Sequence, residues 1–162
     1  MTELSALAAN VSELLKERGD TIAVSESSCA GLLSAALVAI PGASAYYVGG
    51  AIIYTRVAQA GLLRVPDEAM EGQRASTEYY AALNARTIRE IHGTTWALSE
   101  TGASGPTGNR YGDDAGHACI AVSGPVERVV TIETRDSDRE GNMWAFAEAA
   151  FGLLEDCLRE AG

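Results

Sequence analysis

The chain has 162 residues, of which 47% are hydrophobic and 21% charged, and it contains 17 glycines. This length and composition predict a single globular domain over residues 1–162 and exclude a disordered or collagen-like protein. There are 12 basic and 22 acidic residues, so the net charge is -10. Such a field repels nucleic-acid phosphates and anionic lipid head groups, so we expect neither nucleic acid nor a membrane as partner.

The sequence also predicts a cytoplasmic protein without disulfides. No stretch approaches the roughly 18 consecutive apolar residues of a membrane span. The first residues, Met1 to Leu4, lack the basic flank that begins a signal peptide. The three cysteines are far apart and lack metal-ligand spacing, so we interpret them as reduced thiols. We expect no metal and no cofactor.

Helical spacing of apolar residues predicts helices, and runs of β-branched residues predict strands. The expected elements are a helix over 2–18, a strand over 21–25, a helix over 30–40, a strand over 45–54, short helices over 55–63 and from 66, a helix over 76–92, a strand over 94–99, a loop over 100–116, strands over 118–122 and 128–134, and a closing helix over 143–158. The turn at residues 123–125 predicts an antiparallel hairpin. Together these elements imply an α/β fold, a three-layer α/β/α sandwich on a mixed sheet.

The segment from Ser25 to Gly31 places hydroxyls and a carboxylate where the first strand ends and a helix begins. In α/β sheets ligands bind beyond the carboxyl ends of strands, and free amides at a helix N-terminus can hold an anion or an oxyanion there. The segment therefore lies where an active site is expected. The alternative is that Ser27 or Ser28 only caps the helix.

A second candidate loop, residues 101–109, follows the strand predicted over 94–99. Its three glycines let backbone amides turn toward one point, and Thr101, Ser104 and Thr107 add hydroxyl donors. The spacing is neither a Walker A motif nor a dinucleotide fingerprint, so a plain flexible loop is the alternative. If both loops face one cleft, they can bind a small phosphorylated molecule between them.

At these two loops the sequence resembles the CinA C-terminal domain family, whose enzymatic members are nicotinamide-nucleotide amidohydrolases. The family's Ala-Glu-Ser-Cys-Thr-Gly-Gly stretch matches residues 25–31, and its Thr-Gly-Ile-Ala-Gly-Pro loop matches residues 101–106. Its Pro-Gly-Ser-Ser and Tyr-Ser-Asn-Glu-Ala-Lys stretches match residues 41–44 and 54–59. Order and spacing are kept over nearly the whole chain, so the resemblance implies the family's fold.

The resemblance also implies amide hydrolysis through an acyl-enzyme, without a metal. By position, Ser27 is the nucleophile and Tyr54 its hydroxyl partner. The family's lysine is replaced by Gln59, whose amide has no useful basicity, and the only lysine in the chain is Lys16 in the first predicted helix. The general base is therefore missing from the family position.

Two residues are candidates for a replacement base: Glu26, beside the predicted nucleophile, and His117, beside the glycine-rich loop. Arg56 cannot accept a proton, because a guanidinium stays protonated, but it can bind phosphate. The residues expected to bind the substrate are Ser28, Cys29, Gly31, Arg56, Gln59, Thr101, Gly102, Ser104, Gly105, Arg110 and Arg139.

Three functions stay open. The first is hydrolysis of a small phosphorylated amide such as nicotinamide mononucleotide. The second is binding of a pyridine nucleotide or another phosphorylated metabolite by a domain that has lost its base. The third is a different hydrolysis in which Asp113 and Asp114 recruit a divalent cation. We also expect a homo-oligomer, because family members associate and not all of the tyrosines Tyr46, Tyr47, Tyr79 and Tyr80 can be assigned to one core.

Overall fold

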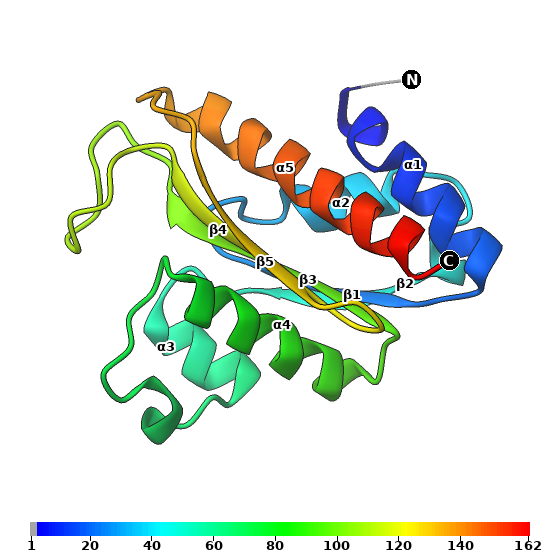
Figure 1. The fold of residues 1–162 in the computed structure, drawn as a ribbon, viewed down its shortest axis with the longest axis horizontal. Coiled ribbons are helices and arrows are strands. Elements are labelled where there is room, and N and C mark those ends of the chain that lie inside the picture. Colours follow the sequence, from blue (N-terminus) through cyan, green and yellow to red (C-terminus); the bar gives the residue numbers. More distant parts are fainter. Residues whose placement is uncertain (1–2) are drawn as a thin grey trace.

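A five-stranded mixed sheet separates two layers of helices (Figure 1). The structure is a computed structural model and describes residues 3–162. The strands are β1 (Ile22–Glu26), β2 (Tyr47–Ile52), β3 (Trp96–Ala103), β4 (His117–Ser123) and β5 (Arg128–Glu133), in the spatial order β2-β1-β3-β4-β5. β1 pairs in parallel with β2 and β3, whereas β4 is antiparallel to both β3 and β5. The predicted mixed sheet and hairpin are confirmed.

Helices cover both faces of the sheet, which confirms the three-layer α/β/α architecture (Figure 1). One layer contains α1 (Glu3–Arg18), α2 (Leu32–Val38) and α5 (Arg139–Glu160), and the other contains α3 (Arg56–Ala58) and α4 (Glu78–His92). Three short helical turns complete the chain: η1 (Ala43–Ala45), η2 (Gln59–Leu63) and η3 (Asp67–Met70). The helix predicted from residue 2 is present from Glu3, and Thr2 lies outside the described residues. Over residues 3–162, no helix combines the length and apolarity needed to cross a membrane.

Each face of the sheet has its own hydrophobic core, because successive residues of a strand point to opposite faces. Along β1 and β3, Val24 and Leu98 belong to the core beneath α1, α2 and α5, whereas Ala23 and Ala97 belong to the core beneath α4. The central strands are therefore buried on both sides. Full burial of a large apolar side chain contributes about 1.5–3 kcal/mol to the stability of the fold. These two cores therefore fix the position of the strands that carry the site.

The tyrosines that prompted the expectation of an oligomer are largely accounted for within the chain. Tyr46 and Tyr80 are buried, at 0% and 1% exposure. Tyr79 is 39% exposed, and its hydroxyl donates to the Ala69 carbonyl at 2.6 Å. Their positions give no separate argument for a partner, and the homo-oligomer stays a prediction.

The strand predicted to end at Ser99 continues as β3 to Ala103, so this predicted boundary is wrong. The extension pairs with β4, with Thr101 opposite Cys119 and Ala103 opposite His117. The strands lie close together at Gly102, where an added Cβ would be 2.5 Å from the His117 carbonyl oxygen. The glycine-rich loop therefore runs from Ser104 to Gly116, and the amides of residues 101–103 belong to the sheet.

Two predicted helix starts also differ from the structure. Helix α2 begins at Leu32, later than predicted, because Ala30 and Gly31 adopt left-handed backbone angles with φ of 52° and 102°. Helix α4 is capped by Thr77, whose hydroxyl accepts an amide of the first turn at 3.1 Å. Ser76, the predicted start, has a φ of 60° and precedes the helix.

Candidate functional site

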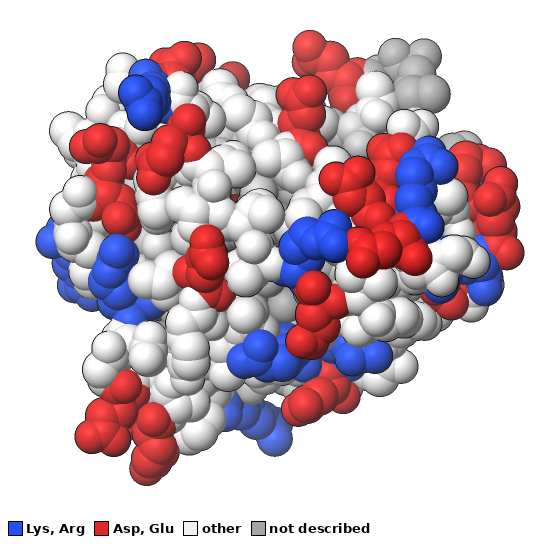
Figure 2. Space-filling view, viewed as in Figure 1, with Lys and Arg blue, Asp and Glu red and all other residues white. Residues whose placement is uncertain are grey.

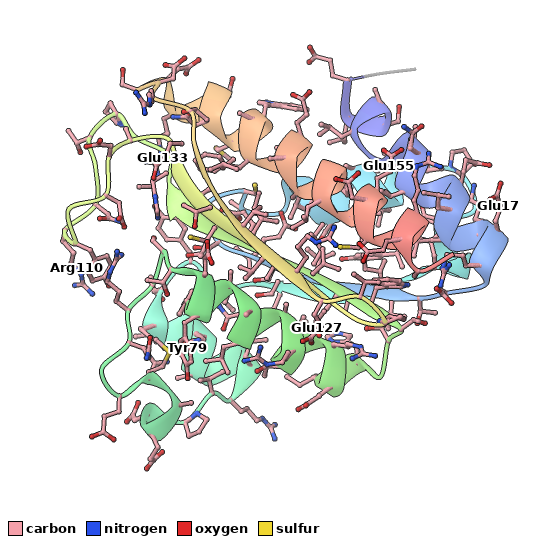
Figure 3. All side chains as sticks on the ribbon, viewed as in Figure 1. Glu17, Tyr79, Arg110, Glu127, Glu133 and Glu155 are labelled. Atoms are coloured by element: carbon pink, nitrogen blue, oxygen red, sulfur yellow. The ribbon has the colours of Figure 1, made fainter. Side chains whose placement is uncertain are left out.

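A cavity of about 570 Å³ lies where β1 and β3 end. Its walls are the serine turn (Ser27 and Ser28), residues 54–56 after β2, residues at the start of α4, the end of β3 with the glycine-rich loop, and the first residue of α5. In Figure 3, Arg110 marks the tip of the glycine-rich loop, and Glu127 marks the opposite end of the sheet. The two loops singled out from the sequence thus face the same cavity.

The lining of the cavity carries positive charge only. Arg56, Arg110 and Arg139 line it, and no Asp, Glu, His or Lys side chain within residues 3–162 does. By contrast, acidic side chains are spread over the whole face drawn in Figure 2, interspersed with basic ones. The cavity therefore offers an anion local cationic partners, although the chain's net charge of -10 repels it at long range.

The serine turn is fixed by Glu100, a residue that the sequence analysis did not single out. Glu100 is 1% exposed and accepts the backbone amides of Ser27 and Ser28 at 3.1 Å and that of Cys29 at 2.9 Å. The Ser28 hydroxyl also donates to it. The expectation that the amides of this turn are free to hold an external anion is wrong, because they hold the chain's own carboxylate.

Glu26 has a similar structural role at the start of α2. It is fully buried and accepts the amides of Gly31, Leu33 and Ser34 at 3.1, 2.8 and 2.9 Å. These bonds satisfy the otherwise unpaired donors at the N-terminus of the helix. Glu26 does not line the cavity, so the geometry gives no support to its predicted role as a base.

Three further predicted residues lie outside the cavity lining. Burial raises the pKa of Cys29 well above its usual value, so this thiol stays protonated and unreactive at neutral pH. Gly31 has a φ of 102° and serves the backbone turn before α2. Gln59 is fully buried, donates to Asn84 at 2.7 Å and accepts from the Arg56 guanidinium at 2.5 Å. Gln59 therefore orients Arg56 instead of facing the cavity.

The other predicted site residues all line the cavity: Ser27, Ser28, Tyr54, Arg56, Thr101, Gly102, Ser104, Gly105, Arg110 and Arg139. Arg139 connects two of the walls, because it donates to the Tyr54 hydroxyl at 3.0 Å and to the Gly105 carbonyl. Since Tyr54 accepts this bond, its own hydroxyl proton is free to be donated elsewhere.

The outer part of the glycine-rich loop is tied to the segment before α4. Arg74 donates to both carboxylate oxygens of Asp113, at 2.7 and 3.2 Å, and its guanidinium lies 5.0 Å from the ring of Tyr111. The Arg110 guanidinium lies at the same distance from that ring. The contacts hold the loop over the cavity.

The predicted use of Asp113 and Asp114 as a cation site finds no support in the structure. Burial raises the pKa of Asp113, but hydrogen bonds from Arg74 and Asn109 lower it by more, so the pKa lies below its usual value. The carboxylate therefore stays ionised and paired. Within residues 3–162, no group of three or more His, Cys, Asp or Glu side chains is arranged to hold a metal ion.

His117 lies outside the cavity lining, beneath the same loop. Its Nδ1 is 2.5 Å from a Glu133 carboxylate oxygen, and its Nε2 is 2.8 Å from the Ser76 carbonyl oxygen. Both partners are acceptors, so only the doubly protonated ring satisfies both. Burial lowers the pKa of His117, but these hydrogen bonds and the charge of Asp113 raise it above its usual value. A ring held in this form is poorly placed to act as the predicted base.

A model of the CinA C-terminal domain matches residues 4–158. The chain belongs to the CinA family. The CinA-like protein of Parasynechococcus marenigrum is 39% identical over 136 residues, which are 84% of this chain and 32% of that protein. The CinA-like protein of Myxococcus xanthus is 35% identical over 139 residues, 83% of this chain and 33% of that protein. This CinA domain thus spans about a third of the length of these curated relatives.

Solved CinA structures share the fold of this domain. A CinA superfamily protein from Klebsiella pneumoniae superimposes with a TM-score of 0.90 at 24% identity, covering 97% of this chain and 98% of that one. A competence/damage-inducible protein from Agrobacterium tumefaciens gives a TM-score of 0.85 at 25% identity, with coverage of 98% and 97%. The fold expected from the sequence resemblance is confirmed.

Proposed function

We propose that this CinA domain binds a small phosphorylated carboxamide in the arginine-lined cavity and hydrolyses the amide to a carboxylate and ammonia. The observation that carries the proposal is the meeting of serine hydroxyls and three guanidinium groups in one cavity without acidic lining. Guanidinium groups bind phosphate through paired hydrogen bonds. The volume of about 570 Å³ suits a ligand of nucleotide size. Nicotinamide mononucleotide is the substrate that the family resemblance suggests.

The family pattern assigns the nucleophile to Ser27 and an assisting hydroxyl to Tyr54. The contact with Arg139 supports the assisting role of Tyr54, because the hydrogen bond at 3.0 Å fixes the phenol oxygen while leaving the phenol proton free. In the proposal the phosphate is bound by Arg139 and Arg56, the latter oriented by its bond to Gln59. The loop around Arg110 covers the bound molecule.

The proposal is tested by incubating the purified chain with nicotinamide mononucleotide and measuring ammonia with a coupled enzymatic assay. Mass spectrometry of the same samples follows the appearance of nicotinate mononucleotide. We expect equimolar ammonia and acid. If the protein releases ammonia from no member of a panel of phosphorylated carboxamides, hydrolysis is refuted.

A second candidate function is binding without turnover, which one observation favours. No titratable side chain in the cavity lining can accept a serine proton at neutral pH, and Gln59 has no basicity to offer. The domain would then sense or sequester a pyridine nucleotide or another phosphorylated metabolite. Isothermal titration calorimetry separates the candidates: binding heat without ammonia release supports the binding protein, and ammonia release excludes it.

A further inference from the structure

The two serines of the turn differ in one respect that bears on the missing base. Ser28 donates its hydroxyl hydrogen to Glu100, whereas the Ser27 hydroxyl makes no hydrogen bond within residues 3–162. Both serines line the cavity. A serine hydroxyl becomes a competent nucleophile when an adjacent base accepts its proton. Of the two, only Ser28 has such a group in contact.

Glu100 is also held in a fixed position, as the base that activates a serine must be. Its two oxygens accept the amides of Ser27, Ser28 and Cys29 at 2.9–3.1 Å, which prevents the carboxylate from rotating away from the Ser28 hydroxyl. Hydrolases that use a serine nucleophile commonly contain a nucleophile, a base and a third group that orients the base. Here the backbone amides of Ser27, Ser28 and Cys29 take the place of that third group and orient Glu100.

The surroundings of Glu100 make it a stronger proton acceptor than a glutamate in water. Burial raises the pKa of Glu100, and hydrogen bonds from Ser28 and from the turn amides offset this only in part. The titratable groups facing it are Glu26, whose charge raises the pKa further, and the buried thiol of Cys29. A base is most effective when its pKa approaches the working pH, and the shift is in that direction.

We propose that Ser28, activated by Glu100, is the nucleophile of this site. This inference rests on the proposed amide hydrolysis and moves the nucleophile one residue along from the position in the family pattern. It supplies the base that is absent from the cavity lining, and neither Glu26, His117 nor Gln59 is placed to do so.

The steps balance without a further reactant except water. The Ser28 proton passes to Glu100 as Oγ bonds to the amide carbon, and the carbon–nitrogen bond then breaks while the nitrogen takes that proton and leaves as ammonia. Water attacks the resulting ester and gives a proton to Glu100. The bond between the acyl carbon and Oγ then breaks, Oγ takes the proton from Glu100, and the carboxylic acid product departs.

Adjacent variants give the sharpest test of this assignment. Ammonia release from nicotinamide mononucleotide is measured for Ser27→Ala, Ser28→Ala and Glu100→Gln, with Glu90→Gln, an exposed carboxylate on α4, as the matched control. We expect kcat to fall about 1000-fold or more in Ser28→Ala and Glu100→Gln, and about tenfold or less in Ser27→Ala. If Ser27→Ala abolishes activity while Ser28→Ala or Glu100→Gln retains it, the assignment is overturned and the proposed hydrolysis stands.

A second measurement uses the unaltered chain, because Glu100→Gln can fail to fold. A fluorophosphonate reacts with activated serines, and mass spectrometry of the peptide containing residues 25–31 locates the adduct. We expect the adduct on Ser28, forming faster as the pH rises through the titration of Glu100. An adduct on Ser27, or none, overturns the assignment. If no phosphorylated carboxamide is hydrolysed, the proposed function fails, and the labelled position still decides the Ser28–Glu100 pair.

Discussion

Replacing Arg139 by methionine tests whether the arginines of the cavity bind phosphate. The change keeps a long side chain and removes the guanidinium that donates to the Tyr54 hydroxyl at 3.0 Å and to the Gly105 carbonyl. A hydrogen bond involving a charged group contributes about 1.5–3 kcal/mol. The loss of one such contact with the ligand corresponds to a Kd for nicotinamide mononucleotide about 10- to 150-fold higher than that of the wild type.

Isothermal titration calorimetry measures this Kd, with Ser27→Ala and Ser28→Ala added to the wild type and to each variant so that the ligand is not hydrolysed during the titration. Arg86→Met is the matched control, because Arg86 is exposed on α4 outside the cavity lining and its loss changes the net charge equally. We expect its Kd to equal that of the wild type. Urea unfolding of each variant establishes that the comparison is between folded proteins. Equal Kd values for Arg139→Met and the wild type would refute the assignment of Arg139 to the phosphate.

Four further substitutions test other features of the structure. Gln59→Lys should lower the free energy of unfolding by about 3 kcal/mol in urea, because it buries an unpaired charge beside Arg56; unchanged stability with faster ammonia release would contradict this. In His117→Gln, the loss of Tm relative to the wild type should be largest below pH 6.5 and should narrow as the pH rises through the raised pKa of His117; a gap that widens would show that the protonated ring is not the stabilising form. Gly102→Ala should lower the free energy of unfolding by about 1–3 kcal/mol, because its added Cβ clashes with the His117 carbonyl. Gly152→Ala, whose added Cβ on α5 lies in open space, should raise the free energy of unfolding by about 0.5–1 kcal/mol. A change of the same sign in both variants, measured by urea unfolding, would argue against the close approach of β3 and β4 at Gly102.

Local patterns predict most of the fold. Helix α1 and the hairpin of β4 and β5 follow from hydrophobic spacing and a turn signal, which depend on neighbours in the sequence. The end of β3 does not, because its last residues are strand only through their pairing with β4. Similarly, the left-handed backbone at Ala30 delays the start of α2, although nothing in that residue type favours such a conformation.

The candidate site is predictable in position but not in its internal pairing. Loops that follow β1 and β3 must meet, since the carboxyl ends of neighbouring parallel strands lie at one edge of a sheet. Which carboxylate serves the serine turn depends on strand register. Ser25 lies opposite Ser99, so Glu26 and Glu100 follow at the same level on adjacent strands. Glu26 turns to the start of α2, and Glu100, 73 residues from Ser27, closes on the serine turn.

The comparison of kcat/KM for nicotinamide mononucleotide and nicotinamide riboside tests the central claim most directly. The two molecules carry the same carboxamide and differ in the phosphate, which is the group assigned to the arginines of the cavity. We expect ammonia release from the mononucleotide with a kcat/KM at least about tenfold higher than for the riboside. Equal values for the two, or no ammonia from either, would contradict it.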